Sequence, residues 1–506
     1  MNISEYRDQF ASFNSSIELA RYKYHVGLTS KVNRQDIFDR YNDLFSLAAI
    51  AELRTSLEQT PAYFRTERTA LRTLLSAAQL RHVETQADEL TRELVRCEAS
   101  DQVGWSSGEL SLEDVPAVLA HESKKTQRRE LAARWIDSIS VCDDLRTARV
   151  VSLNESARML GVASYSELMF EATNTESDQM DQTAQSLLDQ TESPYKSALT
   201  RLVAREIPEV RLSHLDFGDL PYFEAAPWLD VYLPAKNLFR TQSATLAGMG
   251  IRTNKQANIL IDVEPRSSRK SGAACFPVHP PEDVRLAVLP HGGATNFLDG
   301  LKQCGRAQHY AWCSKNLARL HPEFVYSADS ATADGFGYLF RYLSLDPKWI
   351  REFLPEVEAV RSGEIAKDVT CQLALRVRRL CADVLYQALA YNEGESQEHL
   401  QSTYVALYER ATSFSMRPEP FLLNLQSAVR PGSQLRALAF SFGLREYLRV
   451  RYGYRWWTSR KAGDELIDVW NTASRYTVEE LASLIGFGKI SFDPLAEVIA
   501  SALTGA

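Results

Sequence analysis

Residues 289–312 read LPHGGATNFLDGLKQCGRAQHYAW, and this stretch decides the predicted fold more than any other part of the chain. The paired glycines at 292–293 are a turn signal, and the pattern that follows them predicts a helix. Lys302 and Arg306 are four residues apart, so a helix places both side chains on one face. Gln303 lies between them in the sequence. The segment therefore predicts a helix that carries two neighbouring cations and an amide.

This helix resembles the zinc helix of the thimet oligopeptidase and oligoendopeptidase F family of metallopeptidases. In that family the same frame carries HExGH followed by A-x-H. The frame is kept here by Gly305, Ala307 and His309. The resemblance implies that Lys302 and Arg306 stand at the two zinc-binding histidine positions and that Gln303 stands at the position of the glutamate base. The metal-site sequence of the family is therefore degenerate in this chain.

These replacements remove the chemistry that a zinc helix needs. Zinc is held by lone pairs on imidazole, thiolate or carboxylate groups, whereas protonated lysine and arginine side chains only donate hydrogen bonds. Two positive charges also repel a divalent cation, and Gln303 cannot take a proton from water. The one His-Glu step, at 121–122, is followed by no second histidine at the required spacing. We therefore expect no zinc, no other cofactor and no zinc-dependent peptidase activity.

The resemblance continues upstream and downstream of the helix. It covers residues 255–485, and more loosely 164–251. RKSGAACF at 269–276 resembles the strand region that precedes the zinc helix, and residues 284–293 resemble the approach to that helix. LDPKW at 345–349 continues the match.

The family's late helices are also recognisable. LRA at 435–437 and REYLRVRYGYRWW at 445–457 resemble them. Active members have tyrosines just before the LRA step, where this chain has RPGSQ at 430–434. The resemblance thus implies that the groups that stabilise the transition state are altered together with the metal ligands.

The third zinc ligand of the family is a glutamate in an E-x-x-S pattern, and residues 326–340 resemble that region. DSAT at 329–332 is the best match and puts Asp329 at the ligand position, with Asp334 as the alternative. If the fold brings Asp329 beside Lys302 and Arg306, an ion pair takes the place of the metal. Removing one member of such a buried pair would cost about 3–5 kcal/mol.

The resemblance implies a mainly α-helical, zincin-like fold with two helical lobes around a deep cleft and a small β-sheet beside the degenerate zinc helix. Under this interpretation residues 1–250 form an N-terminal helical lobe, residues 251–345 hold the sheet and the degenerate helix, and residues 346–506 form a C-terminal helical lobe. The three segments belong to one intertwined fold. Candidate cleft-lining side chains are His291, Gln308, His309, Asp334, Tyr338 and Gln434.

Three functions are consistent with these features. The favoured one is an inactive peptidase-like protein whose cleft binds a peptide or protein partner without cutting it. The second is an active hydrolase with relocated chemistry at Cys275, Cys304, His291 or His309. Cys304 and His309 are five positions apart, about 140° around a helix, so they are not expected to form a dyad. The third is a structural subunit of a complex.

Several residues also have simpler interpretations. In isolation, Lys302 and Arg306 would be the solvated face of an ordinary helix, and we favour a packed or hydrogen-bonded role for His309. Two basic groups, around residues 266–270 and 376–379, are interpreted as solvated faces. They are short and lack interleaved aromatic side chains, so we expect no nucleic-acid binding.

Composition limits the classes of protein that remain. The chain has 506 residues, enough for about two to four domains, and its net charge of −8 indicates little beyond solubility. MNISEYRDQF at 1–10 is not typical of a secretory signal. No apolar stretch approaches the roughly 18 residues of a membrane span. The seven cysteines are scattered, which favours free thiols in a reducing, cytoplasmic compartment.

Hydrophobic periodicity predicts helices along most of the chain. The expected helices cover residues 3–30, 35–58, 62–100, 128–160 and 176–205, and the region from 347 to about 412. Residues 101–110 are expected to form a loop. The segments 257–263 and 284–289 are the best strand candidates, because they are rich in branched residues and flanked by turns.

Overall fold

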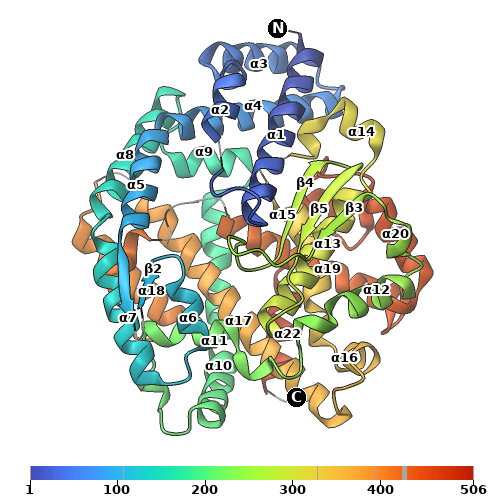
Figure 1. Cartoon of the computed structure of the whole chain (residues 1–506). Helices are drawn as coiled ribbons and strands as arrows, with labels where there is room; N and C mark the ends of the chain where they lie inside the picture. Colours follow the sequence, from blue (N-terminus) through green and yellow to red (C-terminus); the bar gives the residue numbers. More distant parts are fainter. Residues whose placement is uncertain are drawn as a thin grey trace. The chain divides into compact units, whose positions relative to one another are not determined.

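The computed structural model describes residues 2–32, 34–105, 108–326, 329–391, 394–423, 425 and 430–504. The described residues are mainly α-helical with two small sheets (Figure 1), as the sequence predicted. The chain forms two compact units, each assembled from separated segments. Unit 1 comprises Met1–Gln79, Leu229–Ala366 and Arg436–Leu495; unit 2 comprises Leu80–Trp228, Lys367–Leu435 and Ala496–Ala506. The division into three consecutive segments stays a prediction.

Unit 1 contains the predicted zinc-like helix and the three-stranded sheet. Its elements are α1 (Ile3–His25), α2 (Arg34–Arg40), α3 (Leu47–Gln59), α12 (Leu238–Gly248), β3 (Ile259–Asp262), β4 (Ala274–His279), β5 (Asp283–Ala287), α13 (Ala294–Ala311), α14 (Lys315–Leu320), α15 (Ala331–Arg341), α16 (Pro347–Phe353), α20 (Arg460–Trp470) and α21 (Val478–Ile485). Four helices belong partly to each unit: α4 (Arg65–Gln86), α17 (Ala359–Ala390), α19 (Arg430–Tyr452) and α22 (Asp493–Thr504).

Unit 2 is helical apart from one hairpin. Its elements are α5 (Asp88–Ser100), β1 (Gln102–Trp105), β2 (Gly108–Ser111), α6 (Val115–His121), α7 (Lys125–Ser140), α8 (Asp143–Met159), α9 (Tyr165–Ala172), α10 (Ser177–Glu206), α11 (Leu220–Ala225) and α18 (Gln397–Thr412). Short 3₁₀ helices occur at Asn42–Phe45, Leu212–His214, Phe217–Asp219, Pro227–Leu229, Ala235–Asn237, Thr253–Lys255, Pro322–Phe324, Tyr342–Leu345, Glu419–Leu422 and Trp456–Thr458.

The three-stranded sheet lies between α1 and α13 (Figure 1). Its order is β3-β5-β4, with β3 parallel and β4 antiparallel to β5. Phe276 and Val278 pack in a buried cluster with Val26, the residue that follows α1, and Leu19 and Tyr22 of α1 pack against it. Because side chains alternate between the faces of a strand, Cys275 points to the other face, toward α13. The predicted position of the sheet beside this helix is therefore confirmed, and β3 and β5 coincide with the two strand candidates.

Two glycines allow α13 and α15 to cross in close contact. A Cβ atom at Gly305 would lie 2.6 Å from the backbone oxygen of Phe336. A Cβ atom at Gly337 would lie 2.9 Å from Lys302 Cγ and 3.1 Å from Arg306 Cγ. Only glycine leaves room for this approach. The crossing brings the side chains of residues 302 and 306 against α15.

Within 101–110, where a loop was expected, residues 102–105 and 108–110 lie in two paired strands. Val103 of β1 pairs with Leu110 of β2 in an antiparallel register. Val103 is buried in a cluster with Leu131 and Trp135 of α7. The hairpin is therefore held by tertiary packing of a few apolar side chains, which local polarity and glycine content did not indicate.

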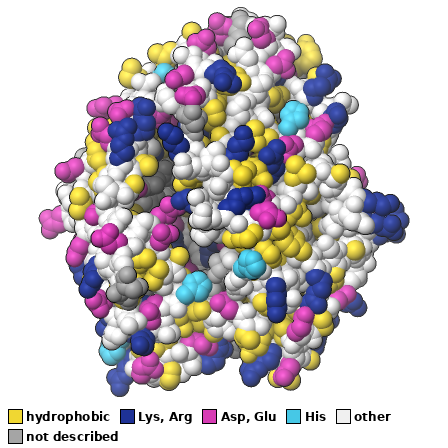
Figure 2. Space-filling view, in the orientation of Figure 1, with side chains coloured by type: hydrophobic (Ala, Val, Ile, Leu, Met, Phe, Trp, Pro, Cys, Tyr) yellow, Lys and Arg dark blue, Asp and Glu magenta, His cyan; other side chains and the backbone are white. Residues whose placement is uncertain are grey.

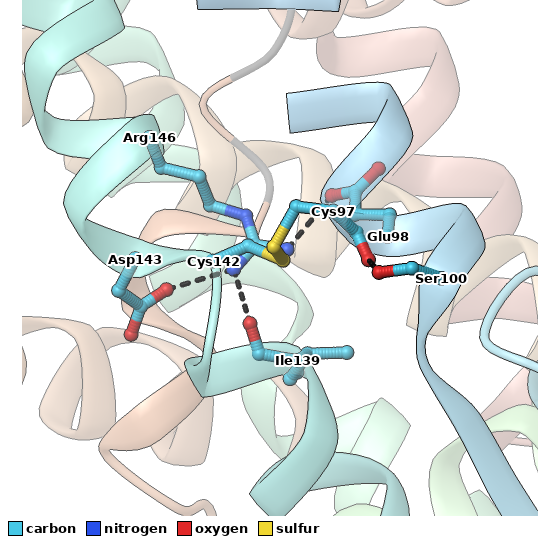
Figure 3. The surroundings of a disulfide bond; sticks show 7 residues. All are labelled: Cys97, Glu98, Ser100, Ile139, Cys142, Asp143 and Arg146. Carbon is cyan, nitrogen blue, oxygen red and sulfur yellow. Dashed lines mark hydrogen bonds and ion pairs between the residues drawn. A yellow bond between two sulfur atoms is a disulfide. The ribbon is translucent and has the colours of Figure 1, made fainter. Parts of the chain in front are cut away.

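The prediction that the cysteines are all free thiols is wrong. Cys97 of α5 and Cys142, the residue before α8, form a disulfide (Figure 3). Beside it, Arg146 donates hydrogen bonds to Glu98 Oε1 at 2.7 Å and to Asp143 Oδ1 at 2.8 Å. The disulfide and the arginine together link α5 to α8. The other five cysteines are free and buried, and the compartment stays a prediction.

Several long predicted helices are interrupted in the structure. Ser46 ends the first part of the 35–58 segment, because its hydroxyl accepts a hydrogen bond from the amide of Ala49 and starts α3. The 62–100 segment is divided between α4 and α5, and the 128–160 segment between α7 and α8. The helix predicted at 176–205 is observed as α10.

Charged side chains of both signs cover the surface. On the face drawn in Figure 2, lysine and arginine are interspersed with aspartate and glutamate. Within the described residues, none of the helices combines the length and the hydrophobicity needed to cross a bilayer.

Candidate functional site

The start of α13 is fixed by a carboxylate that lies 64 residues earlier in the chain. Asp230 Oδ1 accepts a hydrogen bond of 2.8 Å from the amide of Ala294, one of the free amides of the first helical turn. A Cβ atom at Gly293 would lie 1.8 Å from the same oxygen. The glycine pair of the sequence therefore lets an acidic side chain cap the helix, and this cap fixes where the helix begins.

Lys302 and Arg306 of α13 share one carboxylate, that of Asp334 on α15. Lys302 Nζ lies 3.1 Å and Arg306 Nε lies 3.5 Å from Asp334 Oδ1. The other oxygen, Oδ2, accepts a hydrogen bond of 3.1 Å from the Ser330 hydroxyl. The Lys302 ammonium also lies 4.3 Å from the centre of the Tyr338 ring, a cation–π contact. These residues form the candidate site.

The electrostatics of the site follow from its burial. Burial alone would raise the pKa of Asp334, but Lys302 and Arg306 outweigh it and lower this pKa to about 2. Burial would lower the pKa of Arg306, and the Asp334 carboxylate instead raises it. Asp334 and Arg306 are therefore both charged at neutral pH. The two cations and one carboxylate leave one net positive charge.

Asp329, the carboxylate expected beside Lys302 and Arg306, pairs with Arg436. Asp329 precedes α15, where its Oδ1 accepts a hydrogen bond of 3.0 Å from the amide of Ala331. Its Oδ2 pairs with Arg436 Nη1 at 2.9 Å. Arg436, buried on α19, also binds both carboxylate oxygens of Glu479, at 2.8 and 2.7 Å. Arg436 is the site-adjacent residue that sequence reasoning missed, although the LRA match contained it.

Gln303 contacts Arg306 through its side-chain oxygen. Arg306 Nη1 donates a hydrogen bond of 3.1 Å to Gln303 Oε1. The amide thus serves as a neutral acceptor for the guanidinium, at the position where the resemblance implies a general base. An amide in this role cannot act as a base that takes a proton from water near neutral pH.

Three of the candidate thiol and imidazole groups near α13, those of Cys275, Cys304 and His309, are buried. His309 stacks on Phe336 with ring centres 5.3 Å apart, and its Nδ1 has no hydrogen-bond partner among the described residues. Burial, with Arg306 nearby, lowers the pKa of His309 to about 3. Burial raises the pKa of Cys275 to about 12 and that of Cys304 further. At neutral pH these groups are a neutral imidazole and two protonated thiols.

The remaining candidate cleft-lining residues are described by their own contacts. Gln308 is buried and exchanges hydrogen bonds of 2.9 and 3.0 Å with Gln256. Its Oε1 also accepts one from Trp312 Nε1. His291 is exposed just before α13, and Gln434 accepts a hydrogen bond of 2.9 Å from Arg376.

Two arginines that were interpreted as parts of solvated faces are buried. The side chain of Arg269 is 2% exposed and pairs with Asp262. Arg378 is 0% exposed and donates to the carbonyl oxygens of Leu188, Arg410 and Ala411. Their charges are satisfied by groups distant in the sequence, which sequence periodicity cannot indicate.

The residues at the degenerate site do not fit zinc. No group of three or more histidine, cysteine, aspartate and glutamate side chains in the described part of the chain is arranged to hold a metal ion. At 302 and 306 the side chains are cations, and the one carboxylate that they share is already ion-paired. A divalent cation there would meet two positive charges and a single anionic ligand.

The fold is that of solved structures assigned to oligoendopeptidase F. One X-ray structure of a provisionally assigned oligoendopeptidase F superimposes with a TM-score of 0.73 at 13% identity, over 100% of this chain and 92% of that chain. A second, a provisionally assigned oligoendopeptidase F from Bacillus anthracis str. Ames, gives 0.67 at 13% identity, over 98% and 88%. No family model and no curated protein sequence matches the chain. At this identity the likeness shows the fold.

Proposed function

We propose that this chain is a metallopeptidase-like protein that has lost zinc binding and zinc-dependent proteolysis. In this proposal it uses the peptidase-like scaffold to bind a peptide or protein partner without cutting it. The observation that carries the proposal is the Lys302–Asp334–Arg306 ion-pair group. It lies on the helix whose sequence frame matches HExGH, so the ionic contacts stand where metal ligands would be needed.

Three further features support the same proposal. Gln303, at the position of the general base, is a hydrogen-bond acceptor for Arg306. The nearby thiols and His309 are buried and uncharged at neutral pH, which disfavours a substitute nucleophile and base. The fold likeness spans the whole chain, so the scaffold is retained while the reactive groups are replaced.

Two measurements on one preparation test the proposal. Metal content is determined by mass spectrometry after dialysis against zinc. Cleavage and retention are then followed with a mixed peptide library. The proposal expects substoichiometric zinc, intact peptides and a retained subset of them. Stoichiometric zinc together with cleavage that a chelator abolishes would contradict the proposal. Peptides that stay intact but are not retained would contradict the proposed peptide binding.

The remaining parts of the proposal concern partners and location. We propose a peptide or protein ligand, no nucleic acid, no membrane and no cofactor, in the cytoplasm. The Cys97–Cys142 disulfide weighs against a reducing compartment. Fractionation of the native cells, with thiols blocked at lysis, tests the location and the disulfide together.

A further inference from the structure

The ion-pair group has more positive than negative charge. Asp334 is the carboxylate that the described structure places within 4 Å of both Lys302 and Arg306. Asp329, the other acidic side chain of the same segment, pairs with Arg436. A second carboxylate would match the two cations with two anions. Such compensation is strong where solvent is partly excluded.

The Arg306 guanidinium has unused hydrogen-bonding capacity. Its Nη1 donates to the neutral Gln303 side chain. Its Nε is buried and, among the described residues, has no hydrogen-bond acceptor; the Asp334 oxygen at 3.5 Å contributes charge without good hydrogen-bond geometry. Tyr310 is a second neutral partner, which forms a side-chain hydrogen bond with Arg306. Arginine presents a planar fork that matches a carboxylate, so a better acceptor than those present can be accommodated.

The two cations remain partly accessible. The side chain of Lys302 is 13% exposed and that of Arg306 is 22% exposed, and that of Asp334 is 10% exposed. Lys302 is held in place by the Tyr338 ring and by Asp334. An anion that arrives from solvent would therefore meet two oriented positive groups.

We propose that Lys302 and Arg306 bind a carboxylate of a ligand, and that in a peptide this is either the C-terminal carboxylate or an acidic side chain. The inference rests on the proposed peptide-binding function and names the chemical group that the degenerate site recognises. Charge-assisted hydrogen bonds to a partly desolvated arginine are worth enough to change affinity by about tenfold or more.

The first experiment compares two pools of N-acetylated pentapeptides of random sequence, one with free C-terminal acids and one with C-terminal amides. Retention by the full chain is measured by equilibrium dialysis and mass spectrometry. Acid peptides are expected to be retained at least tenfold better. If the side-chain source dominates, the retained amide peptides are instead enriched in aspartate and glutamate to the same degree. Arg306→Gln should abolish either preference.

Control variants separate charge recognition from folding. Arg285→Gln is a matched control, because Arg285 has similar exposure (23%) and its own carboxylate partner, Asp283. It should keep the preference. Asp334→Asn should raise the preference for acids, because it removes the competing internal carboxylate. A merely structural role of Arg306 would not produce this opposite change.

A second experiment needs no peptide. The melting temperature is measured in sodium acetate and in sodium chloride at equal ionic strength. Acetate should stabilise the native chain and Arg285→Gln but not Arg306→Gln. This effect without peptide retention would support the carboxylate site and contradict the peptide-binding function. If peptides are retained without an acid preference and without an acetate effect, the inference is overturned and the peptide-binding function stands. If there is no retention, no acid preference and no acetate effect, the inference and the peptide-binding function are both overturned.

Discussion

Asp329 and Asp334 are five residues apart, and the start of one helix gives them different roles. Asp329 lies before α15 and caps its first amide. Asp334 lies within the first turn, on the face that crosses α13. The linear E-x-x-S pattern selected Asp329. It could not distinguish the roles of the two aspartates, because a sequence pattern does not locate the start of a helix to within one turn. The two cations could be predicted from the sequence. Their carboxylate partner could not, because identifying it requires knowing at which residue α15 begins.

The Asp334 carboxylate is expected to be a large contributor to stability. Asp334→Asn leaves two buried or half-buried cations without an anion, so we expect the free energy of unfolding to fall by about 3–5 kcal/mol. Asp464→Asn is the control, because its pair with Arg460 is exposed at 4.0 Å and such pairs contribute about 0–1 kcal/mol. Urea denaturation of both variants checks the difference, and similar losses would contradict it.

The stability contributed by Asp334 is expected to depend on pH in the acid range. Its pKa is lowered from 3.8 to about 2 in the folded state. A lowered carboxylate pKa stabilises the fold above the unfolded pKa, and this contribution disappears as pH falls through the folded pKa. About 2 kcal/mol should therefore be lost between about pH 4 and pH 2. In Asp334→Asn the corresponding part of the urea-denaturation pH profile should be missing; identical profiles would refute the assignment.

Restoring ligands at the degenerate site should restore metal binding. The substitutions Lys302→His, Gln303→Glu and Arg306→His place two imidazoles at i and i+4, with the Asp334 carboxylate already beside them. We expect about one zinc per chain by calorimetry. Adding Asp334→Asn should weaken binding at least tenfold, whereas adding Asp329→Asn should change it little. The reverse order of effects would show that Asp329 is the ligand position.

At the element scale, the packing of α13 on α15 depends on two glycines. Gly305→Ala would put a methyl group 2.6 Å from the backbone oxygen of Phe336, and a backbone oxygen cannot move aside without shifting the helix. We expect a loss of about 1–3 kcal/mol of unfolding free energy. Gly363→Ala in α17 has nothing within 4 Å and should instead stabilise by up to about 1 kcal/mol. Thermal unfolding of both variants measures the contrast, and equal effects would contradict the close crossing.

Elements that depend on a local sequence pattern could be predicted from the sequence. Features that depend on contacts between residues far apart in the chain could not. The periodicity of residues 176–205 matches α10, and branched residues matched β3 and β5. The hairpin at β1 and β2 forms because Val103 packs against α7. Arg378 is buried because carbonyl oxygens of α10 and α18 receive its hydrogen bonds. These contacts join residues far apart in the chain, so no local pattern indicates them.

At the scale of the whole molecule, fold and chemistry have separate determinants. Two oligoendopeptidase F structures share the fold at 13% identity, so most side chains can change while the helical scaffold remains. The positions that a zinc site needs are a small subset of α13 and α15. In this chain an ion-pair group occupies part of the contact between these helices, where Lys302 and Arg306 of α13 meet Asp334 of α15 across the glycine crossing.

The disulfide provides a test of how the stability of unit 2 contributes to that of the molecule. Cys97 and Cys142 are 45 residues apart, and closing a loop of this length stabilises a fold by about 4 kcal/mol in the chain-entropy description. Reduction should therefore lower the melting temperature of the native chain. It should not change that of the Cys97→Ser/Cys142→Ser variant, whose five other cysteines are buried free thiols. Calorimetry with and without reductant distinguishes two results: one shifted transition means that the two units unfold together, and a new early transition means that unit 2 unfolds alone. An unchanged trace would show that Glu98 and Arg146 hold α5 to α8 without the disulfide.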